Sequence, residues 1–221
     1  MTHRLLIFGD SWAYGSELPE HQRETLCFGG QLAALLGVDS VHNCAETGSS
    51  ISHLHLQFQQ ALTRMSYDPA DCYTAVFFLT GQQRFLAFDP NDEFYNLIPA
   101  GASIRPIQHH YRDLIESVND FYFKHIQSNS ADHVMLNTNI LALQSVCKYH
   151  NIQDYYVSGW QDLHLWPEVD VTRIMPTHCQ ALFGKQDYIT PNQSHPNEQG
   201  HRLIADKLYE FIKSRSLDST I

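Results

Sequence analysis

Short apolar runs and longer amphipathic segments alternate along most of the chain. Consecutive apolar residues are typical of strands buried on both faces of a parallel sheet, and apolar positions spaced by three and four residues are typical of helices. The predicted strands cover residues 4–9, 38–44, 73–80 and 152–157. The predicted helices cover residues 25–36, 51–65, 109–127, 131–150 and 200–215. This alternation predicts an α/β protein in which helices cover both faces of a parallel sheet.

Two long stretches follow neither period. Residues 85–107 contain prolines and clustered aromatic residues, and we expect an irregular insertion above the third predicted strand. Residues 158–195 are expected to form a long active-site loop, with one candidate short fifth strand at 179–183, because loops of this length in compact domains are usually functional. The length of 221 residues fits a single domain spanning 1–221, and we expect the tail after residue 215 to fray.

The composition is that of a globular protein with an acidic balance. The chain is 43% hydrophobic and 17% charged, and its 14 basic and 24 acidic side chains give a net charge of −10. Nucleic-acid binding depends on clustered lysine and arginine, so this balance argues against a nucleic acid as partner. The N-terminus shows no signal-peptide pattern and no apolar run is long enough to span a membrane, so the expected location is cytoplasmic.

The cysteine, histidine and glycine patterns indicate neither a metal nor a cofactor. The five cysteines are widely spaced and form no CxxC, which is typical of reduced thiols. The 14 histidines include no HExxH or other familiar ligand spacing. The glycine-rich signatures of dinucleotide-binding and P-loop proteins do not occur. We therefore expect a protein that works without a metal or a cofactor.

The first candidate for chemistry follows the first predicted strand, in the sequence Gly9-Asp10-Ser11. A glycine permits a sharp turn at the end of the strand, and open α/β sheets bind their ligands just outside the carboxyl ends of their strands. A serine at this point is either a nucleophile or the N-cap of the next helix. Asp10 is expected to be structural and to hold the turn through hydrogen bonds, because neighbouring side chains diverge.

The second candidate lies near the C-terminus, in the sequence His195-Pro196-Asn197 before the last predicted helix. Together with Gly9-Asp10-Ser11 it resembles the SGNH (GDSL-type) hydrolases, in which a Gly-Asp-Ser near the N-terminus carries the nucleophile and a late histidine is the base. The resemblance implies a flavodoxin-like three-layer α/β/α sandwich with a parallel sheet. It also implies that Ser11 is the nucleophile and His195 the base that takes its proton. The alternative interpretation of His195 is a polar residue that caps the last helix.

The same resemblance implies three donors to the oxyanion of the reaction intermediate: the N–H of Ser11, a glycine N–H after the second strand and an asparagine side chain after the third strand. Gly48 matches the glycine. In place of the asparagine stands Gln83, which carries the same amide one methylene further out, and Arg84 is a second candidate through its charge. No GxSxG occurs, so the nucleophile elbow of the α/β-hydrolases is absent.

The position that the family gives to an aspartate, three residues before the histidine, holds Asn192. An asparagine can accept a hydrogen bond from the imidazole and fix its tautomer, but it lacks the charge that stabilises the imidazolium. Asp187 and Asp170 lie further back and either could substitute, and a dyad oriented by a backbone carbonyl is a third arrangement. The sequence does not choose among these.

The function that these motifs predict is that of a cytoplasmic serine esterase of SGNH type, acting on a carboxylic ester or O-acetyl group of a small molecule or carbohydrate. The alternative is a catalytically weak or inactive module of the same fold that binds a carbohydrate or a partner protein, because two of the family positions differ. A phosphodiesterase or nucleotide-handling protein is less favoured, given the acidic charge. Trp12, Tyr14, Trp160 and Trp166 could wall a pocket, although such residues are more often plain core.

Overall fold

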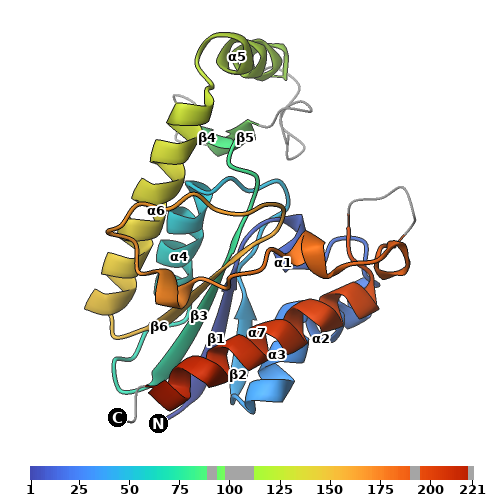
Figure 1. The fold of residues 1–221 in the computed structure, drawn as a ribbon, viewed down its shortest axis with the longest axis vertical. Helices are drawn as coiled ribbons and strands as arrows, with labels where there is room; N and C mark the ends of the chain where they lie inside the picture. Colours follow the sequence, from blue (N-terminus) through green and yellow to red (C-terminus); the bar gives the residue numbers. More distant parts are fainter. Residues whose placement is uncertain (89–93, 98–111, 190–194, 219–221) are drawn as a thin grey trace.

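The structure is a computed structural model, and it describes residues 1–88, 94–97, 112–189 and 195–218. Its centre is a parallel sheet of four strands in the order β2-β1-β3-β6 (Figure 1). The strands are β1 (His3–Phe8), β2 (Ser40–Asn43), β3 (Cys72–Leu79) and β6 (Gln153–Ser158). Ile7 of β1 pairs with Asn43 on one side and with Val76 on the other, so the carboxyl ends of these strands meet at one edge. All four predicted strands are confirmed.

Helices cover both faces of this sheet, which makes three layers (Figure 1). Leu5 and Ile7 of β1 pack with α3 (Phe28–Leu36) and α7 (Glu198–Asp218), whereas Leu6 and Phe8 pack with α4 (His53–Arg64) and α6 (Asn129–Tyr149). Successive side chains of a strand point to opposite faces, so a strand that is apolar throughout must be covered twice. The predicted α/β/α arrangement is confirmed.

The helix predicted over residues 25–36 is divided in two. It consists of α2 (Arg23–Leu26) and α3, separated by Cys27, whose backbone is extended. Gly37 ends α3 in the left-handed conformation at φ +67°, as its position after the last periodic residue predicts. The N-cap of α6 is Ser128, whose side chain accepts a hydrogen bond from the Ala131 N–H.

The stretch predicted to be irregular contains a two-stranded antiparallel ribbon, so that prediction is wrong in part. The ribbon pairs β4 (Phe85–Phe88) with β5 (Phe94–Leu97). The prolines on which the prediction depended, Pro90 and Pro99, lie outside the described residues. Phe85 stacks on Tyr122 of α5 (Arg112–His125), which lies beyond the ribbon in Figure 1. The rest of 85–107, and the start of the helix predicted from residue 109, lie outside the described residues.

The segment after β6 is built from short 3-10 turns. These are η3 (Val171–Arg173), η4 (Cys179–Leu182) and η5 (Lys185–Asp187); another, η1 (Glu20–Gln22), follows α1. The fifth strand predicted at 179–183 is therefore wrong, because the His178 side chain caps a helical turn there by accepting from the Ala181 N–H. The predicted frayed tail falls partly on residues 219–221, outside the described residues. None of the described helices is long and apolar enough to cross a membrane.

Candidate active site

The turn after β1 is held so tightly that only glycine fits at its first position. Gly9 has φ +154°, and a Cβ built on it would lie 2.7 Å from the Cβ atoms of both Ala13 and Phe78. The buried Gln57 side chain of α4 accepts from the Gly9 N–H at 3.0 Å and donates to its carbonyl at 2.9 Å. The chain therefore leaves the sheet abruptly at this point, and Ser11 follows at the end of the turn.

Ser11 is the first residue of the short helix α1 (Ser11–Tyr14) and is half-buried. The N-cap of this helix is Asp10, whose Oδ1 accepts from the Trp12 N–H at 3.0 Å. The sequence left Ser11 as either a nucleophile or the N-cap of the next helix. In the structure Asp10, and not Ser11, is the N-cap. Trp12 is fully buried and packs on Trp160, with their ring centroids 4.3 Å apart, so it belongs to the core.

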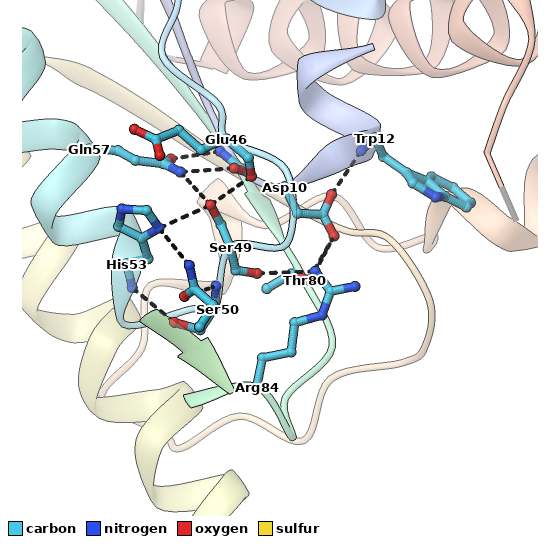
Figure 2. Close-up of polar contacts among 11 residues, drawn as sticks. Asp10, Trp12, Glu46, Ser49, Ser50, His53, Gln57, Thr80 and Arg84 are labelled. Atoms are coloured by element: carbon cyan, nitrogen blue, oxygen red, sulfur yellow. Dashed lines mark hydrogen bonds and ion pairs between the residues drawn. The ribbon is translucent and has the colours of Figure 1, made fainter. Parts of the chain in front are cut away.

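Asp10 is a buried carboxylate that joins three loops (Figure 2). Its Oδ2 accepts from the Thr80 hydroxyl at 2.7 Å and from the Arg84 guanidinium at 3.0 Å. Arg84 also donates to the Ser49 carbonyl at 3.1 Å, so one side chain ties the turn after β1 to the loop after β2. A buried charge needs a partner and further hydrogen bonds, and Asp10 has both. The structural role predicted for Asp10 agrees with these contacts.

The loop at 45–50, after β2, rests on a second buried network, also drawn in Figure 2. Ser49 Oγ accepts from Gln57 Nε2 at 2.8 Å and lies 3.1 Å from His53 Nδ1 of α4. Asn96 of β5 accepts from the Ser50 N–H at 2.9 Å and lies 3.2 Å from the same His53 nitrogen. Burial lowers the pKa of His53 from 6.5 to about 4, so its ring is neutral at pH 7.

This network holds Gly48 in a tight turn at φ +77°, a conformation that favours glycine. Its N–H donates to none of the described residues, which leaves it available to a ligand oxygen. Gln83, the sequence candidate for a further donor, is exposed in the turn before β4. The other candidate, Arg84, is committed to Asp10 and Ser49 through one nitrogen.

His195 lies three residues before the first residue of α7, next to a short antiparallel bridge between Pro196 and Tyr188. Its carbonyl accepts from the Ile189 N–H at 3.1 Å. Its ring nitrogen Nδ1 lies 3.5 Å from Oε1 of Glu17, and the two side chains are 23% and 42% exposed. Glu17 has φ +69°, the left-handed region that a residue with a branched or long side chain rarely adopts.

The two motifs from opposite ends of the chain therefore meet through their neighbours. The N–H of Ser16, next to Glu17, donates to the Ser11 carbonyl at 2.9 Å. The ring of Trp12 lies 6.5 Å from that of Tyr188, which pairs beside His195. Within the described part of the chain, no hydrogen bond joins Ser11 Oγ to His195. Catalytic hydrogen bonds often tighten only when substrate binds, so a catalytic pair is compatible with this geometry.

Of the residues considered from the sequence as orienting partners of His195, Asn192 lies outside the described residues, and Asp187 and Asp170 accept hydrogen bonds from other groups. Asp187 is buried, and its carboxylate accepts from the Gly184 N–H at 2.7 Å. Asp170 caps η3 by accepting from the Thr172 N–H at 3.0 Å. Glu17 could not be recognised from the sequence, because it lies in a polar loop with no motif and its backbone conformation cannot be inferred from its residue type.

The described part of the chain also contains cavities, two of which border the sheet and the loop after β2. A cavity of about 540 Å³ is lined by Ile152, Gln153 and Asp154 at the start of β6, the sheet edge opposite to Ser11. A cavity of about 290 Å³ lies beside the loop after β2, between Glu46 and Gln57. Among the described residues, no three histidine, cysteine, aspartate or glutamate side chains are grouped so that they could hold a metal ion.

The fold is similar to that of several solved structures, two of which are described as esterases. The psychrotrophic esterase EstA from Pseudoalteromonas sp. matches with a TM-score of 0.53 and 14% identity, over 96% of this chain and 97% of its own. TesA matches with a TM-score of 0.54 and 12% identity, over 96% and 98%. A family two carbohydrate esterase from Clostridium thermocellum, solved in complex with cellohexaose, matches with a TM-score of 0.52 and 14% identity, over 96% of this chain and 64% of that chain.

At these identities the likeness shows a shared fold, and the α/β/α fold expected from the resemblance to SGNH hydrolases is confirmed. No protein-family model matches the sequence, and no curated protein is significantly similar to it.

Proposed function

We propose that this protein is a serine hydrolase of the SGNH type, which cleaves a carboxylic ester or an O-acetyl group through an acyl-enzyme on Ser11. The observation that carries this proposal is the meeting of the Ser11 turn and the His195 turn at one edge of the sheet, through the contact of Glu17 with His195. This edge, at the carboxyl ends of the strands, is where open α/β sheets place their ligands.

In this mechanism His195 accepts the proton of Ser11 through Nε2, while Ser11 Oγ bonds to the carbonyl carbon of the ester. The negative oxygen that forms is stabilised by the backbone N–H groups of Ser11 and Gly48. His195 then returns the proton to the departing alcohol, and water hydrolyses the acyl-enzyme by the same sequence of steps.

The substrate class is proposed from chemistry and from the structural neighbours. Two of the three similar structures are described as an esterase and a carbohydrate esterase. An ester or O-acetyl group on a small molecule or a carbohydrate fits the reaction that these residues can perform. Gln83 and Asn192 are further candidates for a donor and an orienting residue, and both remain proposals.

A fluorophosphonate probe tests the proposal without knowledge of the substrate, because it labels only an activated serine. We expect the wild type to be labelled and to hydrolyse p-nitrophenyl acetate. Ser11→Ala and His195→Ala should each lower turnover, by on the order of 10⁴-fold if they act as triad members. The matched control is Ser16→Ala, which removes a hydroxyl five residues away and should keep both activities. Wild-type hydrolysis by a folded Ser11→Ala variant would refute the esterase.

The alternative is an inactive module of the same fold that binds a carbohydrate or a partner protein. The observations that favour it are the missing hydrogen bond between Ser11 and His195 in the described chain and the exposure of Gln83. A wild-type protein that the probe does not label, but that binds a sugar oligomer in calorimetry, would favour this module over the esterase.

A further inference from the structure

The structure places a carboxylate beside one ring nitrogen of His195. Nδ1 of His195 lies 3.5 Å from Oε1 of Glu17. In a serine hydrolase the orienting acid contacts one imidazole nitrogen, and the other nitrogen takes the proton of the serine. A contact at Nδ1 therefore leaves Nε2 for Ser11.

We propose that Glu17 is the positioning residue of this site: it orients the His195 ring and stabilises the imidazolium that forms when Ser11 gives up its proton. The inference rests on the proposed function and supplies the acid that the sequence does not have at Asn192. Glu17 keeps its negative charge throughout, because the proton moves from Ser11 Oγ to His195 Nε2 and then to the leaving alcohol.

The backbone of Glu17 supports this role. Its φ of +69° belongs to the region in which glycine and asparagine are favoured, and a glutamate there is strained. A surface loop with no other task would accommodate glycine at this position. The backbone after Gly15 thus adopts a strained conformation at the same residue whose carboxylate contacts His195.

The other charged groups around His195 do not offer the same contact. Asp187 lies on the adjacent turn and is committed to Gly184. His201 of α7 is buried and has its pKa lowered to about 3 by that burial and by His195, so it carries no charge at pH 7. Glu198 is exposed in the first turn of α7. Among the described residues, no other carboxylate lies within ion-pair distance of the His195 ring.

The partial exposure of both side chains sets the size of the effect. The attraction between two unit charges about 4 Å apart in a water-like environment is weak, so its loss should change the rate by only about fivefold. Salt screens such a pair, so the effect should shrink at about 1 M ionic strength.

The test is the steady-state kinetics of the full chain on p-nitrophenyl acetate, measured at low ionic strength and again at about 1 M salt. In Glu17→Gln we expect kcat to fall about fivefold at low ionic strength with KM unchanged, because the charged ring that forms in the reaction loses its partner. We expect this difference from the wild type to shrink in salt. Glu17→Asp should recover part of the lost kcat. The matched control is Glu20→Gln, which removes an equal charge from the same exposed segment.

A second variant separates positioning from a structural role. Glu17→Gly relieves the strained backbone, so a merely structural Glu17 would be replaced without loss. We expect this variant to fold at least as well as the wild type and to lose activity like Glu17→Gln. An unchanged kcat in Glu17→Gln, or an equal fall in Glu20→Gln, would overturn the proposal even in an enzyme that the fluorophosphonate labels. Absence of labelling in the wild type would instead overturn the proposed function.

Discussion

At the scale of single residues, the turn after β1 depends on the absence of a side chain at Gly9. We expect Gly9→Ala to lower the free energy of unfolding by about 3 kcal/mol, because its Cβ would overlap Ala13 and Phe78 and the strand could not turn. The variant should also lose fluorophosphonate labelling, since Ser11 would be displaced. Urea unfolding followed by fluorescence measures the first effect.

The matched control is Gly81→Ala, at the end of β3. A Cβ on Gly81 would meet nothing within 4 Å, so this substitution should change the free energy of unfolding by less than about 0.5 kcal/mol. If the two glycines tolerated alanine equally well, the steric account of the Ser11 turn would be contradicted.

The residues of the site differ in how far the sequence could identify them. Ser11 and His195 lie in short motifs, so the sequence alone is enough to name each as a candidate. Glu17 and Asn96 could not be identified in this way, because neither lies in a motif and each acts through a contact between segments that are distant along the chain. A left-handed glutamate and a buried asparagine on a ribbon have no local sequence signal that would reveal them.

At the scale of elements, the β4–β5 ribbon is a separate two-stranded sheet that supports the loop after β2. Its Asn96 accepts from the Ser50 N–H and so fixes the loop that holds Gly48. We expect Asn96→Ala to cost about 2 kcal/mol, because the Ser50 N–H would stay buried without an acceptor. Amide hydrogen exchange should show faster exchange at Ser50, while the amides of β1 and β3 stay protected.

The control for this prediction is Phe85→Ala on the partner strand. This change removes the stacking of Phe85 on Tyr122 but leaves in place the hydrogen bond that the Ser50 N–H donates to Asn96. Equal acceleration of Ser50 exchange in both variants would mean that the whole ribbon, and not Asn96, holds the loop.

The elements that the sequence predicts correctly are those with a strong physical pattern. A strand buried on both faces must be apolar throughout, and β1 and β3 therefore stand out. The ribbon does not, because its four-residue strands are too short to show alternation and lie near prolines. The residues of η4 predict a strand because their apolar side chains fit either structure, and the capping by His178 that decides between them depends on side-chain placement.

At the scale of the whole molecule, the parallel sheet explains how the ends of the chain meet. Parallel strands all present their carboxyl ends at one edge, so the turn after β1 and the long segment after β6 share that edge. The helix α7 then returns along the face that α3 covers. This topology, not any local sequence, sets His195 beside the Ser11 turn.

The same packing buries histidines that stay neutral in the folded chain at pH values where the unfolded chain would protonate them. His201 of α7 accepts from the Phe28 N–H of α3 at 3.2 Å, and burial lowers its pKa from 6.5 to about 3. A histidine whose folded-state pKa is lowered contributes stability that is full above pH 6.5. That stability is lost as the pH falls towards the folded-state value, since the unfolded chain then binds the proton. His53 acts in the same direction, with a pKa of about 4.

Two buried carboxyl groups oppose this trend. Burial raises the pKa of Asp132 and of Asp154, so each holds a proton in the folded state over a range where the unfolded state has lost it. Their contribution grows as the pH falls in that range. The pH dependence of the wild-type free energy of unfolding therefore contains contributions from the histidines and from these carboxyl groups. A substitution is needed to isolate the contribution of His201.

We expect the wild-type free energy of unfolding to fall more steeply between pH 6.5 and 4.5 than that of His201→Gln, by about 1.4 kcal/mol per pH unit, which is the linkage of one proton. Glutamine keeps an acceptor for the Phe28 N–H but cannot take up the proton. Urea unfolding at three pH values measures the two slopes, and the exposed His21→Gln serves as control because its ring lies in solvent in both states. Equal slopes in the wild type and His201→Gln would show that His201 is not kept neutral by the fold, and that the contact between α3 and α7 is open to water.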